Sequence, residues 1–230
     1  MHKYKILVFL LIMSLWSVSA KGQDYRYEIG GMAGTSFYMG DANKTKLYQN
    51  VYPSLGAIFR YNKDFRWSLK TNLVIGKVGG DTKKSDNVFP FAQTTSFERL
   101  FYELGGQVEF NFFNYSNDYA YLNTTKFTPY VFTGIGFTYA AGGKSFFDAN
   151  IPLGIGMKYK IKERFNLGFE FSFRRLFRDD FDVTQKEGFN LDDPYDIKSG
   201  PVKNKDWYSL TMITLTWDFG PRCKDCLNLY

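Results

Sequence analysis

Two cysteines lie close together near the C-terminus of this 230-residue chain. Cys223 and Cys226, in the stretch CKDCLNLY, are its only cysteines. A C-x-x-C pair can bind a metal, carry out thiol–disulfide exchange or form a disulfide. Two thiolates alone make a weak zinc site, because zinc takes four ligands, and a thioredoxin-like role requires the pair at the start of a helix in a βαβ fold. What the pair does therefore depends on what the other residues build.

Histidine is absent from the chain after His2. A serine or cysteine nucleophile activated by histidine, or a histidine metal site, therefore has no basis in the remaining sequence. Two carboxylates alone can act as acid and base, but Glu103 and Glu109 are separated by about 20 Å along an extended strand. We predict that the protein is not an enzyme and has no cofactor, metal or small-molecule substrate.

A group of aspartates in the second half of the chain invites comparison with a calcium site. Asp179, Asp180 and Asp182 stand in RDDFDV, and three more follow at Asp192, Asp193 and Asp196. Their spacing does not match the calcium-binding loop of a helix–loop–helix motif. We interpret them as solvated acids of a loop.

The N-terminus has the pattern of a secretory signal peptide over residues 1–20. Lys3 and Lys5 precede a short apolar run, and Val18-Ser19-Ala20 provides small residues for cleavage, which could extend to residue 22. The apolar run is too short for a membrane-spanning helix. We expect an exported protein. Its modest net charge of +6 and its export argue against nucleic acid as a partner.

Beyond this signal, apolar and polar residues alternate, as in strands with two different faces. In RLFYELGGQVEFNFF, Leu100, Tyr102 and Leu104 share one face, while Glu103 and Glu109 share the other. The pattern recurs in RWSLKTNLVIG, TPYVFTGIGFTYA, IPLGIGMKYKI and FNLGFEFSFRR. It also explains why a chain with 20% aromatic residues has a mean hydropathy of only −0.31.

Eight such segments predict an all-β fold, an eight-stranded antiparallel transmembrane β-barrel of the OmpX/OmpA-like type over residues 24–220. We expect strands of about 9–11 residues, as in small outer-membrane barrels. The long polar segments 40–53, 77–98 and 175–206 are predicted outer loops. The turns near 62–64 and 162–164 are tight and are predicted to face the periplasm. Residues 114–127 break this rule and form either an extra docking surface or a loose loop.

Inward-facing charges are predicted to pair in the narrow lumen, since a buried charge without a partner is costly. An eight-stranded barrel is filled by side chains. We therefore interpret these charges as a salt-bridged plug and not as a selective conduit. The predicted network consists of Glu28, Arg60, Lys70, Glu103, Glu109, Lys158, Glu170 and Arg174.

Several stretches together resemble one family. YEIGGMAGTSFYMGD, FYELGGQVEFNFFNY, KFTPYVFTGIGF and WYSLTMITLTWDFG are similar to PorG-like outer-membrane proteins of the type IX secretion system. This resemblance implies a non-enzymatic barrel in the outer membrane of a Gram-negative bacterium, which anchors a periplasmic ring made of a PorK-like lipoprotein and a PorN-like partner. The system exports proteins and supports gliding motility in some species. A stand-alone barrel for adhesion or envelope integrity is the alternative.

The tail, residues 221–230, follows the eighth predicted strand and so returns to the periplasm. The family resemblance includes a short, basic, cysteine-containing end, which Arg222, Cys223, Lys224 and Cys226 match. Because the periplasm is oxidising, we predict disulfide chemistry for the cysteines. They pair either with each other or with a ring partner.

Overall fold

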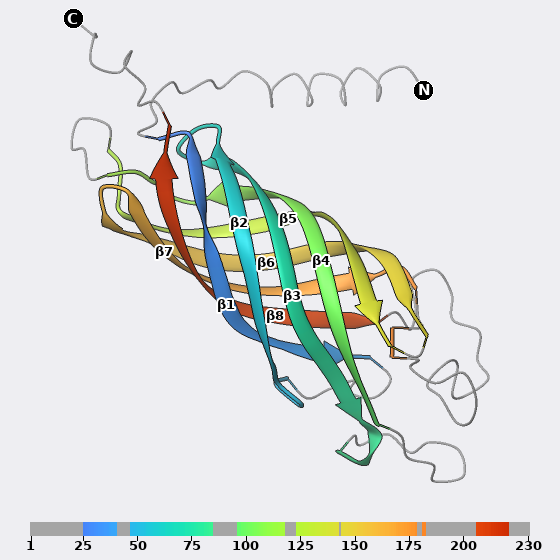
Figure 1. Ribbon diagram of the computed structural model, residues 1–230. Helices are drawn as coiled ribbons and strands as arrows, with labels where there is room; N and C mark the ends of the chain where they lie inside the picture. Colours follow the sequence, from blue (N-terminus) through green and yellow to red (C-terminus); the bar gives the residue numbers. More distant parts are fainter. Residues whose placement is uncertain are drawn as a thin grey trace, which may run out of the picture.

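Eight strands run through nearly the whole described chain in the computed structural model (Figure 1). The structure describes residues 25–40, 47–84, 96–117, 123–142, 144–178, 181–182 and 206–220. The elements are β1 (Tyr27–Met39), β2 (Tyr52–Asn62), β3 (Trp67–Asp81), the short 3₁₀ helix η1 (Thr82–Lys84), β4 (Ser96–Asn111), β5 (Phe127–Ala141), β6 (Phe146–Lys162), β7 (Phe165–Leu176) and β8 (Trp207–Phe219).

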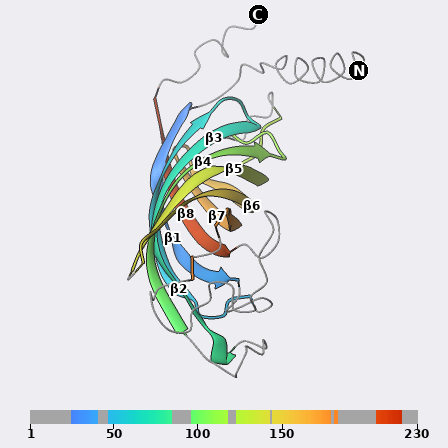
Figure 2. The ribbon, with the colours of Figure 1, turned by 90° about the vertical axis from the view of Figure 1, so that its right-hand side faces the viewer.

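Each strand pairs antiparallel with the next, and β8 pairs with β1, which closes the barrel. Figure 2 shows how strongly the strands curve around the common interior. The predicted fold class, an all-β antiparallel barrel of eight strands, is therefore confirmed. In the part of the chain that the structure describes, no helix has the length and apolar character needed to cross a membrane.

All strands but β2, which has 11 residues, are longer than the 9–11 residues predicted, and the longest are β6 with 17 residues and β4 with 16. The segment 77–98 was predicted as a loop, but pairing between β3 and β4 continues to Asp81 and Ser96. Alternating hydropathy marks only the part of a strand that meets hydrocarbon. Backbone hydrogen bonding needs no apolar face and carries the two strands farther.

The barrel has two different ends. The end at which β1 begins and β8 finishes, here called the terminal end, also carries the tight turns 63–66 and 163–164 and the connection 112–126. In the first of these turns, Asp64 accepts hydrogen bonds from the backbone N–H groups of Arg66 (2.8 Å) and Trp67 (2.7 Å). The opposite end, here called the loop end, carries the connections 40–51, 82–95, 142–145 and 177–206.

The wall is apolar outside and polar inside. Outward side chains such as Leu55, Ile135 and Ile155 are 60% or more exposed, whereas inward side chains such as Lys70 and Glu103 are buried. Aromatic residues lie toward both ends of the wall: Tyr27, Phe59 and Phe219 pack together at the terminal end, and Phe137 stacks on Phe147 toward the loop end. An apolar exterior with aromatic residues toward its edge is the arrangement of a transmembrane β-barrel.

Two glycines on neighbouring strands show how tightly this wall is built. A Cβ atom on Gly134 would lie only 2.0 Å from the backbone oxygen of Gly106. A Cβ atom on Gly106 itself would meet nothing within 4 Å. Of these two positions, only position 134 therefore requires glycine, because the two backbones approach closely there.

The substitution Gly134→Ala is expected to destabilise the barrel by about 1–3 kcal/mol, because the added methyl group forces the backbones of β4 and β5 apart. Gly106→Ala is the matched control and should change the free energy of unfolding by less than about 0.5 kcal/mol. Urea unfolding of the refolded protein in detergent measures both. Equal losses for the two variants would contradict the packing argument.

Candidate functional site

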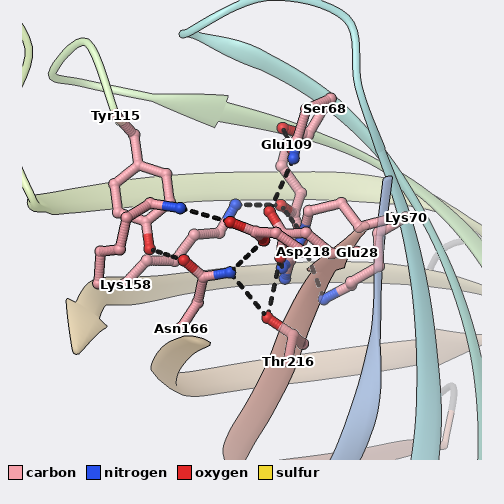
Figure 3. A network of polar contacts seen from close by, with 12 residues as sticks. Glu28, Ser68, Lys70, Glu109, Tyr115, Lys158, Asn166, Thr216 and Asp218 are labelled. Carbon is pink, nitrogen blue, oxygen red and sulfur yellow. Dashed lines mark hydrogen bonds and ion pairs between the residues drawn. The ribbon is translucent and has the colours of Figure 1, made fainter. Parts of the chain in front are cut away.

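The centre of the barrel interior is an ion-pair network around Arg60 on β2 and Glu109 on β4. Figure 3 shows part of this network, with Glu28, Lys70, Glu109 and Lys158 labelled. Arg60 Nε lies 2.9 Å from Glu109, and the same guanidinium also pairs with Glu28. Glu109 in turn binds Lys70 at 3.3 Å and Lys158 at 2.5 Å. One carboxylate thus holds three cations that come from three different strands.

Further pairs extend the network across the lumen. Lys70 reaches Glu170 at 2.7 Å, and the Tyr130 hydroxyl donates to the same carboxylate at 2.6 Å. Nearer the loop end, Arg174 binds Glu103 at 3.0 Å. Glu103 also accepts hydrogen bonds from Tyr208 and Asn72, at 2.6 and 2.9 Å. The structure thus places all eight residues of the predicted network inside the barrel, each with a partner of opposite charge.

One interior ion pair was missed by the sequence analysis. Lys160 binds Asp218 at 2.5 Å, and Asn166 donates to the same carboxylate at 2.5 Å. The signal was present, because Asp218 continues the inward positions of Thr214 and Thr216 on β8. With this pair, the described residues of the network comprise five cations and five carboxylates, so the charges within the network balance.

The terminal end of the barrel is closed by part of the connection between β4 and β5. Residues 112–117 and 123–126, here called the Tyr115 cap, pair with each other through Ser116 N–H to Thr125 O (3.1 Å) and Thr125 N–H to Asn114 O (2.9 Å). The hydroxyl of Tyr115 enters the barrel and donates to Asn166 Oδ1 at 2.7 Å. The ammonium groups of Lys158 and Lys160 lie 5.9 and 5.6 Å from the Tyr115 ring centroid.

Burial is the main reason why the pKa of Tyr115 is raised far above its usual range, and the negative charges of Glu28 and Asp218 raise it further. The hydroxyl therefore stays protonated and can donate its hydrogen bond. The described part of 114–127 is thus neither a loose loop nor only a surface, since it fills the mouth of the barrel. The small cavity beneath it, about 20 Å³ and lined by Tyr25, Glu28 and Asp218, has room for about one water molecule.

A second side chain closes the loop end. Phe181 is fully buried and packs against Tyr38, Phe146 and Tyr208, while Arg99 donates to its backbone oxygen at 2.7 Å. The next residue, Asp182, is also buried and accepts a hydrogen bond of 2.7 Å from the Tyr38 hydroxyl.

Asp182 is therefore not a solvated loop acid, and that interpretation is wrong for it. Phe181 fills the mouth of the barrel and brings its neighbour inside. The other aspartates of the group, Asp179, Asp180, Asp192, Asp193 and Asp196, lie outside the described residues. Among the residues that are described, no three histidine, cysteine, aspartate or glutamate side chains could together hold a metal ion.

The proposed docking residues Arg222, Cys223, Lys224 and Cys226 lie outside the described residues, as does the signal segment 1–20. What the structure describes is a barrel whose interior is filled with paired charges and whose two mouths are occupied by Tyr115 and Phe181.

A model of one protein family matches almost the complete chain. The match covers residues 4–228, and the family is described as a domain of unknown function, DUF6089. The chain belongs to the DUF6089 family. No curated protein matches it.

Solved structures similar to this DUF6089 protein are small barrels with low sequence identity. Neisserial surface protein A (NspA) has a TM-score of 0.49 at 13% identity, over 84% of this chain and 97% of its own. Ail, the attachment invasion locus protein of Yersinia pestis, has 0.47 at 14% identity, over 86% and 100%. OprG of Pseudomonas aeruginosa has 0.45 at 13% identity, over 87% and 99%.

Glu109→Gln in this DUF6089 protein is expected to lower the free energy of unfolding by about 3–5 kcal/mol, because it leaves buried cations without their shared carboxylate. Adding Lys158→Met should restore part of the loss by removing one of those cations. Urea unfolding in detergent, followed by the gel mobility of folded and unfolded forms, measures both effects.

The exposed Glu98, which accepts a hydrogen bond from Tyr52 at 2.9 Å, provides the control. Glu98→Gln should cost less than about 1 kcal/mol. Two results would show that the interior network does not hold the barrel together. One is a loss of stability in Glu98→Gln as large as that in Glu109→Gln. The other is no recovery of stability when Lys158→Met is added to Glu109→Gln.

The Tyr115 cap is expected to respond in two steps. Tyr115→Phe removes the hydrogen bond to Asn166 and should cost about 0.5–1.5 kcal/mol. Tyr115→Ala also removes the ring over the two lysines, so it should speed hydrogen exchange at the amides of Ser116 and Thr125. The amide of Leu104, in the middle of β4, is the internal control and should be unaffected. Unchanged exchange at Ser116 and Thr125 in the alanine variant would mean that Tyr115 does not hold the cap.

Proposed function

We propose that the protein is a non-enzymatic outer-membrane component of the type IX secretion system, which anchors a periplasmic ring of a PorK-like lipoprotein and a PorN-like protein to the membrane. The observation that supports this most is the filled interior. Arg60, Lys70 and Glu109 occupy the middle of the lumen, and Tyr115 and Phe181 occupy its mouths. A barrel filled in this way offers its surfaces to partners, and cargo must pass elsewhere.

Fixed ends suit a structural role. The Tyr115 cap is tied both to the turn 63–66, through Tyr115 N–H to Phe65 O at 3.3 Å, and to the interior, through Asn166. Small barrels keep their short turns on the periplasmic side. On this basis the terminal end faces the periplasm and presents a rigid surface there. The tail leaves from the same end, where Cys223 and Cys226 would fasten it to a partner with the help of Arg222 and Lys224.

Adhesion by a stand-alone barrel is the second candidate. The observation in its favour is the anchoring of the connection 177–206 at both of its ends. The carboxylates of Asp182 and Asp206 both lie within hydrogen-bonding distance of the Tyr38 hydroxyl inside the loop-end mouth. The two ends of the longest connection are thereby held together, as a binding loop requires.

Removal of residues 222–230 tests the anchor. We expect the shortened barrel to assemble normally but to recover much less PorK-like and PorN-like protein when it is affinity-purified from membranes, and secretion to fall with ring recovery. The matched variant replaces residues 183–205 by a short Gly/Ser linker and keeps Asp182 and Asp206. It should leave ring recovery and secretion near wild type.

The opposite pattern would identify the loop end as the working surface. The adhesion hypothesis would replace the anchor hypothesis under two conditions. Ring recovery and secretion would be normal without residues 222–230, and the loop variant would lose attachment to surfaces.

A further inference from the structure

Exposed charges are divided unequally between the two ends of the barrel. Within the ranges that the structure describes, the terminal end has one exposed carboxylate, Glu163, and six exposed basic side chains. These six, here called the basic rim, are Arg26, Lys63, Arg66, Lys126, Lys162 and Arg164. They come from the residue before β1, from the end of β6 and from all three connections at that end, so they surround the barrel mouth.

The loop end differs, because its described cations are interspersed with carboxylates. Its partly or fully exposed side chains include the cations Lys77, Lys83, Lys144, Arg175 and Arg178 and the carboxylates Asp81, Glu98 and Asp148. Two further carboxylates, Asp182 and Asp206, are buried at the same mouth. Among the described side chains that are partly or fully exposed, the excess of cations over carboxylates is therefore larger at the terminal end, with six against one, than at the loop end, with five against three.

Other carboxylates near the basic rim are engaged inside the fold. Asp64 accepts the backbone N–H groups of its own turn and is buried. Asp218 is buried against Lys160. The interior network balances its own charges, so it does not offset the rim. Positive charge therefore concentrates at this mouth.

Two arginines of the basic rim are held in place by uncharged partners. Arg66 Nε donates to Asn114 Oδ1 at 3.1 Å, and Arg164 Nε donates to the Tyr25 hydroxyl at 3.0 Å. The Arg164 guanidinium carbon also lies 5.1 Å from the Tyr25 ring centroid. A neutral partner orients a guanidinium without cancelling its charge. The terminal nitrogens then keep the planar geometry that binds a carboxylate with two hydrogen bonds.

These partners also fix the direction in which the two arginines act. Asn114 belongs to the Tyr115 cap, and Tyr25 lines the small cavity beneath it. Both guanidinium groups are therefore drawn toward the mouth of the barrel and away from the lipid around its wall. A ligand can therefore reach both groups at the terminal end.

We infer that the basic rim, with Arg66 and Arg164 as its oriented members, is a docking surface for a carboxylate-rich protein surface. This inference rests on the proposed function, which places the terminal end toward a periplasmic partner, and adds the chemistry of that partner. Opposite charges on two surfaces speed association and select the partner. Pre-oriented arginines lower the cost of ordering side chains on binding.

The test uses the full mature chain in phosphatidylcholine nanodiscs and fluorescent polyglutamate as the probe. Arg66→Gln with Arg164→Gln is expected to weaken binding about tenfold, whereas Lys77→Gln with Arg178→Gln, the same change of charge at the loop end, should weaken it less than twofold. Arg66→Lys with Arg164→Lys keeps the charge without the planar fork and should lie between them. Gel mobility without heating verifies that each variant is folded.

The inference would be overturned if both glutamine double variants lost binding equally, or if the glutamine variant at Arg66 and Arg164 bound polyglutamate like the wild type. It would also be overturned if the lysine variant at Arg66 and Arg164 bound like the wild type, because the oriented guanidinium groups would then have no role. Vesicles with phosphatidylglycerol form a second arm. If the Arg66/Arg164 pair loses vesicle binding but keeps polyglutamate binding, the rim serves lipid headgroups. Polyglutamate is not a component of the secretion system. A negative result in this binding test therefore does not decide the separate test of ring recovery after removal of residues 222–230.

Discussion

Ionised groups inside a narrow tube surrounded by hydrocarbon must find partners within the tube, and this constraint governs the whole barrel. Separating any of these charges from its partner would cost several kcal/mol. The constraint is met by sharing, since Glu109 contacts Arg60, Lys70 and Lys158 together. It also accounts for the buried phenols, because Tyr130 and Tyr208 supply the further hydrogen bonds that Glu170 and Glu103 require. Ion pairs and hydrogen bonds thus fill the interior of this barrel, whereas apolar side chains fill the core of a soluble protein.

The two ends of this polar interior are closed by different side chains. At one mouth Tyr115 descends from a connection and binds Asn166, and at the other Phe181 packs among aromatic rings. The first closure is polar and lies within a ring of exposed cations. The second combines the aromatic ring of Phe181 with the buried carboxylates of Asp182 and Asp206. Closure of the lumen is thereby carried by short segments of the connections.

The sequence predicted the wall and the inward residues well, because alternation with a period of two assigns every side chain in a strand to one face. Glu28 and Arg60 even face each other directly in the β1–β2 register. It could not predict that Lys70 meets Glu170, since that contact depends on how the closed barrel brings β3 opposite β7. Tyr115 and Phe181 escaped prediction for a different reason. They stand in connections without periodicity, and only the shape of the closed mouth gives them a role.

The pairs that cross the lumen join residues far apart along the chain. Lys70 and Glu170 are separated by 100 residues, and Glu103 and Tyr208 by 105. A half-formed sheet can pair charges on neighbouring strands, such as Glu28 with Arg60, but it cannot make these pairs across the lumen, and contacts between residues so far apart in sequence form slowly. Closure of the barrel and pairing across the lumen then depend on each other. An exported chain with this network would depend on an assembly pathway that keeps its charges hydrated until the last strand has joined the first.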